Sequence, residues 1–294
     1  MLVTGGSGFI GSHVVDSLSA AGYTVRVLDK IKPLNSRAEW VKGDVTSKQD
    51  AQDAMRDVET VFHLAAVADV NVAATDPETC LTVNELGTLN LLRACSGVEV
   101  ERFILASTVW VYGKATGVVT EETPLQPPGD TYTKTKIGQE HLVYSWCQSN
   151  SLPYTILRYD IPYGPGMRSN MAIAAFVRRA IRKEPITIFG DGKQGRCWIF
   201  VKDLAEAHGM VLKESARNQT LNLAGMEFVT ISEIVDLLSK IFGSFPIKHE
   251  PARASDFAGV QTSIEKARKT IDWSPSTRFA DGLSKYVAHV QGSK

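Results

Sequence analysis

The sequence predicts an α/β protein, built as a doubly wound parallel sheet with a smaller C-terminal α+β lobe. Two observations support this fold class. Short apolar segments alternate with helix-forming segments through the first half of the 294-residue chain, and a glycine-rich turn follows the first apolar segment. Alternation of this kind places helices on both faces of a parallel sheet.

The first element is a strand over residues 1–4, which runs into the turn Gly5-Gly-Ser-Gly-Phe-Ile-Gly11. Gly5 permits a backbone turn that a side chain would oppose, and Gly8 lets the backbone approach a pyrophosphate. Gly11 lets the next helix pack closely against the strand. The N-terminus of that helix would then face the anion.

A helix over residues 9–21 and a strand over 24–28 follow, and Asp29 closes the strand. An acidic residue about 20 residues after such glycines accepts hydrogen bonds from the adenosine ribose. Its negative charge would repel a 2'-phosphate, which favours NAD over NADP. This is the Rossmann arrangement, and a doubly wound domain without a nucleotide is the alternative.

The remaining elements continue the alternation. We expect strands over 39–43, 60–64, 102–106 and 154–158, helices over 50–56, 77–95 and 132–149, and an irregular loop over 114–130. The composition changes near residue 160. We therefore expect an NAD-binding domain over 1–160 and a substrate-binding lobe over 161–294, with some segments of the lobe returning to the first domain.

Composition restricts the partners. The chain has 32 basic and 32 acidic residues, so neither a nucleic acid nor a membrane surface is indicated. No apolar run reaches the length of a membrane span, and we expect no signal sequence before the first strand. The cysteines, which are Cys80, Cys95, Cys147 and Cys197, lack metal-site spacing and are expected to be reduced. We expect a soluble cytoplasmic protein without a metal.

Three residues form a candidate catalytic set. Tyr132 and Lys136 are four residues apart on a predicted helix and share one face. An adjacent ammonium stabilises a phenolate, so Tyr132 is a candidate proton acceptor. Thr108 ends the strand over 102–106, where its hydroxyl could relay a proton from a substrate oxygen. The alternatives are an ordinary amphipathic helix and a turn residue that closes a strand.

Together these motifs resemble the extended short-chain dehydrogenase/reductase family, which includes nucleotide-sugar epimerases and dehydratases. The resemblance covers nearly the whole chain. Besides the glycine turn, the matching segments are 43–45, 63–66, 83–84, 107–113, 132–136, 157–159, 163–166, 189–192, Arg196, 201–203 and 272–275.

The resemblance implies further cofactor contacts. Asp44 and Val45 would hold the adenine, and Asn84 would lie near the ribose or the nicotinamide. Lys136 would also bond the nicotinamide ribose. The other implied cofactor contacts are Phe9 and Ile10 in the glycine turn, Leu64, Ala65 and Ala66 after a strand, and Ser107 beside Thr108, with Ser107 making its contact through the backbone.

In the second lobe the resemblance implies a nucleotide-diphosphate site. Arg196 and Arg253 would bind the diphosphate, because a guanidinium offers a fork of donors and keeps its charge when buried. Thr187 and Phe189 match positions that pack against the nucleobase. The alternative for each arginine is a surface ion pair.

The chain departs from the family pattern at several positions. Ile161 replaces an asparagine that touches the substrate phosphate, and Lys202 replaces an aspartate. Val109 and Trp110 occupy the places where sugar dehydratases carry Asp-Glu, which argues against the 4,6-dehydratase reaction. Acids elsewhere, at Glu121, Glu122 or Asp160, could serve a dehydratase or a decarboxylase.

The expected function is therefore an NAD-dependent nucleotide-sugar 4-epimerase, with a UDP-sugar favoured and a transient 4-keto intermediate. The alternatives are a nucleotide-sugar dehydratase or decarboxylase, an NAD(P)H-dependent ketoreductase, and a non-catalytic NAD-binding regulatory protein. The resemblance also implies a homodimer that pairs through the helices over 77–95 and 132–149.

Overall fold

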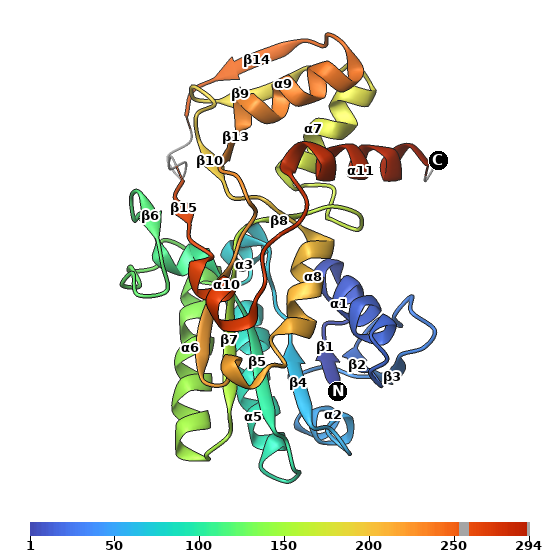
Figure 1. Cartoon of the computed structure of the whole chain (residues 1–294), viewed down its shortest axis with the longest axis vertical. Coiled ribbons are helices and arrows are strands. Elements are labelled where there is room, and N and C mark those ends of the chain that lie inside the picture. The colour runs from blue at the N-terminus through green and yellow to red at the C-terminus, as the bar shows by residue number, and fades with distance from the viewer. Residues whose placement is uncertain (253–258, 293–294) are drawn as a thin grey trace.

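A seven-stranded parallel sheet forms the centre of the molecule in the computed structural model, which describes residues 1–252 and 259–292 (Figure 1). The strand order is β12-β7-β5-β4-β1-β2-β3, and every pair is parallel. The strands are β1 (Leu2–Thr4), β2 (Arg26–Asp29), β3 (Glu39–Lys42), β4 (Thr60–His63), β5 (Arg102–Thr108), β7 (Tyr154–Tyr159) and β12 (Gln219–Leu223). The order reverses between β1 and β4, so the predicted doubly wound fold is confirmed.

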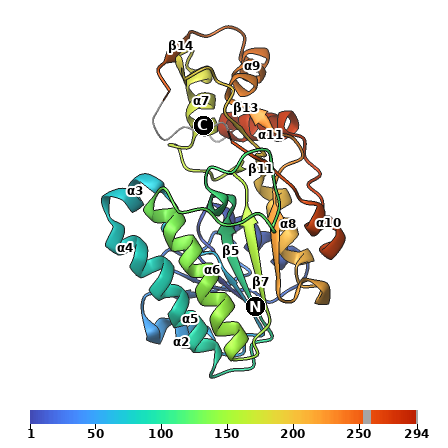
Figure 2. The same ribbon diagram turned by 90° about the vertical axis from the view of Figure 1, so that its left-hand side faces the viewer.

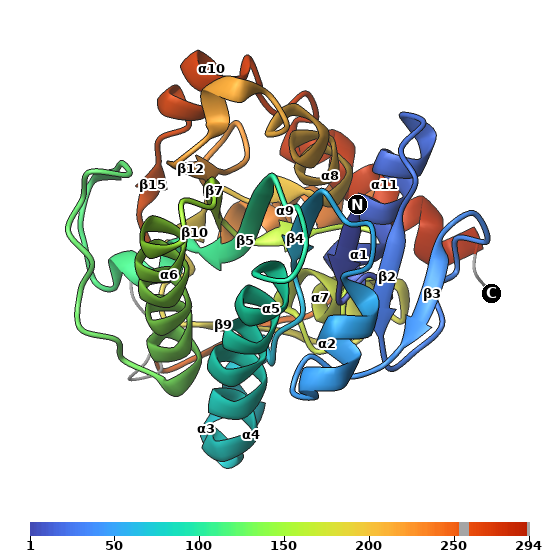
Figure 3. The ribbon, with the colours of Figure 1, turned by 90° about the horizontal axis from the view of Figure 1, so that it is seen from below.

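Alternate residues of the buried strands supply two apolar layers, one on each face of the sheet. Val3 and Phe62 pack with α1 (Phe9–Ala20), α8 (Val201–Met210) and α10 (Glu265–Ile271). Their neighbours Leu2 and Val61 pack with α2 (Lys48–Ala54), α5 (Gly87–Cys95) and α6 (Thr131–Ser149). Figure 3 shows the two sets of helices on opposite sides.

The segment expected as one helix over 77–95 is continuous but changes its winding. It begins as α4 (Pro77–Leu81), passes through the π-helical turn η1 (Thr82–Leu86) and ends as α5. A short helix, α3 (Val70–Thr75), precedes it. Figure 2 shows α4 and α5 beside α6 on one side of the molecule.

Elements after β7 divide between the large sheet and a separate group with its own apolar core, here called the second lobe. β12 adds to the edge of the large sheet beside β7, and α8 packs against α1. The lobe itself has its own apolar core, which is built mainly from α7 (Ala172–Ile181), α9 (Ile231–Phe242) and α11 (Phe279–Gly292). Figure 1 shows this lobe above the sheet.

Short paired strands complete the second lobe and its junction with the first. The pairs are β8 (Pro162–Tyr163) with β11 (Ile199–Phe200), β9 (Ile186–Phe189) with β14 (Ile247–Glu250), β10 (Gly195–Arg196) with β13 (Val229–Thr230), and β6 (Val118–Val119) with β15 (Gln261–Thr262). Within residues 1–252 and 259–292, no helix is long and apolar enough to span a membrane.

Candidate active site

The glycine turn lies at the C-terminal end of β1, where neighbouring backbone leaves no room for side chains. Gly5 has a φ of 68°, and a Cβ there would lie 2.8 Å from the Ala65 backbone. A Cβ on Gly11 would lie 2.1 Å from the Gly5 carbonyl oxygen. Gly8 is the N-cap of α1, and no side chain caps the helix. The first amides of α1 are therefore left for an anion, as a pyrophosphate cradle requires.

Asp29 ends β2 directly beside this turn. Its carboxylate accepts hydrogen bonds from the Ser7 amide at 3.0 Å and from the Ile31 amide at 3.0 Å. Each carboxylate oxygen can accept more than one bond, so these contacts orient Asp29 and still allow it to accept from a ribose. Asp44 lies nearby and pairs with Lys30 at 2.6 Å.

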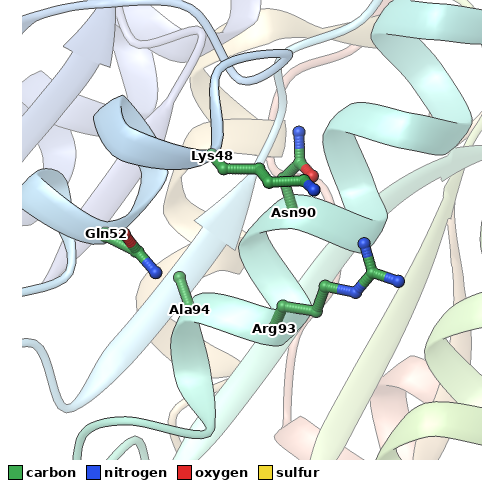
Figure 4. Close-up of a pocket in the computed structure, with 5 residues that line it drawn as sticks. All are labelled: Lys48, Gln52, Asn90, Arg93 and Ala94. Atoms are coloured by element: carbon green, nitrogen blue, oxygen red, sulfur yellow. The ribbon is translucent and has the colours of Figure 1, made fainter.

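The segment expected to hold the adenine is supported from behind by α5. The Asn90 amide nitrogen donates to the carbonyl oxygens of Val45 at 3.1 Å and Thr46 at 2.9 Å. Figure 4 shows the surface pocket that Asn90 lines, between α2 and α5. The other lining residues are Lys48, Gln52, Arg93 and Ala94. Asn90 thus fixes the Val45 backbone against the helix layer.

Leu64, Ala65 and Ala66 follow β4 and are half-buried beside the glycine turn. The Ala65 amide donates to the Thr4 hydroxyl at 3.2 Å, and Thr4 bonds His63 Nδ1 at 2.8 Å. His63 Nε2 reaches the Thr88 hydroxyl at 2.8 Å. Burial lowers the pKa of His63 to about 3, and the charge of Lys136 adds to that effect. His63 is therefore a neutral bridge that holds the strand ends together.

Asn84 lies in the π-helical turn and is fully buried. Its side chain accepts from the Val67 amide at 2.7 Å and donates to the Thr135 hydroxyl at 2.8 Å. These bonds join the loop after β4 to the helix that carries Tyr132. Asn84 is thus held by protein groups, and its expected place near the ribose or the nicotinamide stays a prediction.

Thr108, Tyr132 and Lys136 meet at the C-terminal end of β5. Thr108 is the last residue of the strand, and its hydroxyl lies near enough to Tyr132 to favour the ionised phenol. The Lys136 ammonium lies 6.0 Å from the centre of the Tyr132 ring and donates to the Ala106 carbonyl oxygen at 3.0 Å. Asp130 caps the helix by accepting from the Thr133 amide at 2.8 Å, which fixes its first turn.

The surroundings shift the protonation of both titratable members of this set. Burial raises the pKa of Tyr132 to about 12, and the nearby Thr108 hydroxyl opposes that rise. Burial lowers the pKa of Lys136 to about 8, against the opposing charge of Glu140. At neutral pH the lysine is therefore an ammonium and the tyrosine a phenol, and Tyr132 needs further positive charge to lose its proton.

A buried charged network lies beneath Lys136. Glu140, one helical turn along α6, accepts from the Ser107 hydroxyl at 2.5 Å and from Arg158 Nη2 at 2.7 Å. Arg158 Nη1 donates to the Tyr112 hydroxyl at 2.9 Å. The side chain of Ser107, whose backbone is the expected cofactor contact, is therefore directed into protein.

The positions that follow Thr108 carry no acid. Val109 is buried, and Trp110 packs edge-on against Tyr132 with ring centres 6.5 Å apart. Of the acids proposed as substitutes, Glu121 accepts from the Asn222 amide at 2.7 Å, and Asp160 is buried with both oxygens hydrogen-bonded. Glu122 is exposed on the loop.

Arg168 connects the two lobes near Tyr132. Its guanidinium pairs with Asp69 at 3.2 Å, and Asn170 donates to the same carboxylate at 2.8 Å. The positive charge of Arg168 also opposes the burial-driven rise in the pKa of Tyr132. The ion pair with Asp69 therefore holds the Arg168 guanidinium, which belongs to the second lobe, near Tyr132.

The predicted nucleotide residues lie on strands of the second lobe. Thr187 and Phe189 are half-buried and alternate with the buried Ile186 and Ile188, so they project from the opposite face of β9. Arg196 is on β10 and donates to the Gly195 carbonyl oxygen at 2.6 Å.

Two further predictions from the sequence concern Ile161 and Arg253. Ile161, at the family asparagine position, packs against the apolar core of the second lobe. Arg253 lies outside the described residues, and nothing is inferred about its contacts.

The side-chain contacts that support the set are not apparent from the sequence motifs. Glu140 follows Lys136 at helical spacing, and this could have suggested a partner on the same face. Arg158 reaches Glu140 only through a tertiary contact, and Trp110 and Arg168 approach Tyr132 in the same way. Within residues 1–252 and 259–292, no group of His, Cys, Asp and Glu side chains could hold a metal ion.

Comparisons with known proteins agree with the fold and with the motifs. UDP-glucuronic acid 4-epimerase from Bacillus cereus, solved with UDP-glucuronic acid and NAD, is 30% identical with a TM-score of 0.93, covering 100% of this chain and 99% of that chain. UDP-glucose 4-epimerase from Thermotoga maritima, solved with UDP-glucose, is 30% identical with a TM-score of 0.93, covering 99% and 98%.

A relative with a different reaction is also similar. UDP-glucuronic acid decarboxylase 1 of Arabidopsis thaliana is 31% identical over an alignment 307 residues long, which covers 98% of this chain and 69% of that protein. The family model described as the NAD dependent epimerase/dehydratase family matches residues 1–224. The resemblance predicted from the motifs is thus confirmed, and the chain belongs to the NAD dependent epimerase/dehydratase family.

Proposed function

We propose that this protein is an NAD-dependent nucleotide-sugar 4-epimerase that acts on a UDP-sugar. The observation that carries the proposal is the meeting of Thr108, Tyr132 and Lys136 at the end of β5, with Val109 and Trp110 in place of additional acids. The similarity to 4-epimerases solved with UDP-glucose and UDP-glucuronic acid supports the choice of UDP-sugar.

The strand ends fit the cofactor. Gly5, Gly8 and the uncapped amides of α1 would hold the pyrophosphate, and Asp29 would bind the adenosine ribose. Bound NAD would supply the acceptor and donor of the sugar C4 hydride and the positive charge of its nicotinamide ring.

Tyr132 is the proposed proton acceptor. Its phenol oxygen would take the proton of the sugar 4-hydroxyl, while Thr108 bonds the same substrate oxygen and Lys136 stabilises the phenolate. The same phenol would return the proton after the 4-keto sugar has turned over in the cleft. No net redox change results, so the cofactor should stay bound through the cycle.

The second lobe, which we assign to residues 161–294 apart from α8, β12 and α10, would bind the nucleotide. Arg196, with Arg253, is proposed for the diphosphate, and Thr187 and Phe189 for the nucleobase. The position of Arg196 on β10 and the outward direction of Thr187 and Phe189 from the lobe core support these roles.

We also propose a cytoplasmic homodimer. Leu81 and Leu86 on the α4–α5 segment are 39% and 41% exposed, and Tyr144 on α6 is 54% exposed. The helices that carry them, the α4–α5 segment and α6, run together on one side of the molecule (Figure 2). The described cysteines are all free and buried, which agrees with a reducing compartment.

The test is the Tyr132→Phe variant, with Tyr144→Phe on the same helix as its matched control. Tyr132→Phe should lose at least a thousandfold in turnover of UDP-glucose or UDP-glucuronic acid and retain bound NAD. Tyr144→Phe should retain both. Near-normal turnover in Tyr132→Phe would contradict the assignment.

Product analysis by NMR separates the alternatives. A 4-epimer indicates the proposed reaction, a stable keto sugar indicates a dehydratase, and a pentose nucleotide indicates a decarboxylase. Stoichiometric NADH consumption indicates a ketoreductase. Tight NAD binding with no conversion of any sugar nucleotide or carbonyl compound would favour the regulatory protein.

A further inference from the structure

Asp160 is a buried carboxylate at the junction of the two lobes, and the proposed reaction does not use it. It follows Tyr159, the last residue of β7, which pairs with Thr108 across the sheet. Its exposed fraction is 2%. Asp160 is therefore one residue past the partner of Thr108 in the sheet register, and it is buried from solvent.

Protein groups occupy both oxygens of this carboxylate. The Ile161 amide donates to Oδ1 at 2.8 Å, and the Thr262 hydroxyl donates to Oδ2 at 2.7 Å. The Cys197 backbone and the charge of Arg196 also stabilise the ionised form. Both oxygens of this carboxylate are thus bonded within the protein, which favours a structural role for Asp160 over proton transfer to a substrate.

The groups around Asp160 come from the strand that carries Arg196 and from a segment packed on it. A Cβ on Gly259 would lie 2.0 Å from the Gly195 carbonyl oxygen and 2.5 Å from Arg196 Nη1, so the two backbones are in close contact. The Thr262 amide donates to Cys197 Sγ at 3.5 Å. Residues 259–262 and β10 are thus fixed to each other and, through Asp160, to β7.

We propose that Asp160 is a positioning residue for nucleotide binding. Its carboxylate holds Thr262 and the backbone after Arg196 in register with β7, and this directs the Arg196 guanidinium toward the nucleotide diphosphate. Burial of a charged carboxylate is costly unless it is compensated, and the compensating groups here belong to this junction. The proposal rests on the proposed function, in which Arg196 binds the diphosphate.

The test uses the full chain with bound NAD and UDP as the probe. Asp160→Asn removes the charge and keeps the size, and Thr262→Val removes the hydroxyl that Asp160 accepts from. Each should weaken UDP binding in calorimetry about tenfold, as expected from loss of one charge-assisted hydrogen bond. Turnover at saturating substrate should stay within about twofold, because Thr108, Tyr132 and Lys136 are untouched.

Thr155→Val is the matched control. Thr155 is also a buried threonine, on β7, and its hydroxyl donates to the Ala216 carbonyl oxygen at 2.7 Å, away from Arg196. It should bind UDP like the wild type. Weakening in Thr155→Val equal to that in Thr262→Val would overturn the proposal, because any buried threonine would then have the same effect.

Amide hydrogen exchange gives a readout that does not depend on a nucleotide. In Asp160→Asn, residues 195–198 and 259–263 should exchange faster than in the wild type. Unchanged exchange in both segments would overturn the positioning role.

Arg196→Ala separates this proposal from the proposed function. Wild-type UDP affinity in Arg196→Ala would contradict the nucleotide site and the Asp160 proposal together. Weakened binding in Arg196→Ala with wild-type binding in Asp160→Asn would contradict the Asp160 proposal alone.

Discussion

Glu140 and Arg158 form a buried ion pair one helical turn from Lys136, with Nη2 and Oε2 2.7 Å apart and side-chain exposed fractions of 5% and 8%. The carboxylate also accepts a hydrogen bond from Ser107. Its charge raises the pKa of Lys136, against the burial that lowers that pKa to about 8. Glu140 therefore has two effects: it stabilises the contact between α6 and β7, and it raises the pKa of Lys136.

Replacing Glu140 should affect both stability and the pH dependence of turnover. Glu140→Gln leaves the Arg158 guanidinium buried without its counter-ion, which should cost about 3–5 kcal/mol in free energy of unfolding. It also removes the group that raises the pKa of Lys136. The ammonium would then be lost at lower pH, so the alkaline limb of kcat should move to lower pH.

Urea unfolding and a kcat–pH profile measure these two effects. Glu206→Gln, an exposed position on α8, is the control and should change neither. If Glu140→Gln is too unstable to assay, the double variant Glu140→Gln/Arg158→Met should recover stability and still show the shifted limb. If the alkaline limb of kcat stays at the wild-type pH in either variant, Glu140 does not raise the pKa of Lys136.

Gly11→Ala should disturb the cofactor cradle. The added Cβ would lie 2.1 Å from the Gly5 carbonyl oxygen and 2.8 Å from the Gly6 Cα, so the glycine turn must move. We expect at least tenfold weaker NAD binding and a loss of about 1–3 kcal/mol in stability. Calorimetric titration with NAD and urea unfolding measure both.

Gly209→Ala is the control for a glycine-to-alanine change in a helix. A Cβ on Gly209 meets no atom within 4 Å, so this change in α8 should stabilise the protein by about 0.5–1 kcal/mol and leave NAD binding unchanged. Wild-type NAD affinity in Gly11→Ala would show that the cradle tolerates the side chain.

Local patterns were sufficient to predict the sheet and the cofactor end of the site. The glycines, Asp29 and the set of Thr108, Tyr132 and Lys136 are recognisable because each depends on short spacings along one strand, turn or helix. The structure brings the last three together at the end of β5.

Features that depend on distant partners could not be predicted in this way. Asp160 bonds Thr262, which is 102 residues away, and Glu121 bonds Asn222 across 101 residues. The π-helical turn was missed because Asn84 is held there by Val67 and Thr135, which belong to other elements. Sequence spacing carries no signal for such contacts.

If the protein is a homodimer that pairs through the α4–α5 segment and α6, introducing a negative charge on their exposed faces should separate the subunits. A negative charge at Leu86 or Tyr144, which are 41% and 54% exposed, would have to be buried in the interface. Sedimentation velocity at micromolar concentration should give about twice the 32.1 kDa chain mass for the wild type and the monomer mass for Leu86→Glu/Tyr144→Glu. Ile247→Glu, 44% exposed on β14, should remain dimeric. A monomeric wild type would refute the prediction.

Asp160 should make the stability of this protein depend on pH in an unusual direction. Burial raises the pKa of Asp160 to about 6 from 3.8, although Thr262, Arg196 and the Cys197 backbone oppose the rise. A carboxyl whose folded pKa is raised contributes stability that is fully present below the unfolded pKa and is lost as pH rises through the folded pKa. The wild type should therefore lose this contribution between about pH 4 and pH 7, to a total on the order of 3 kcal/mol.

The asparagine of Asp160→Asn does not ionise, so this variant should not lose that stability as the pH rises. Its free energy of unfolding relative to the wild type should increase as pH rises from 4.5 to 7.5, measured by urea unfolding at each pH, whereas the exposed Asp236→Asn should show no such trend. A difference between Asp160→Asn and the wild type that is constant with pH would mean that the carboxyl does not titrate in this range. A variant that is more stable at neutral pH but binds UDP more weakly is the combination expected when a buried charge serves a binding site at the expense of stability.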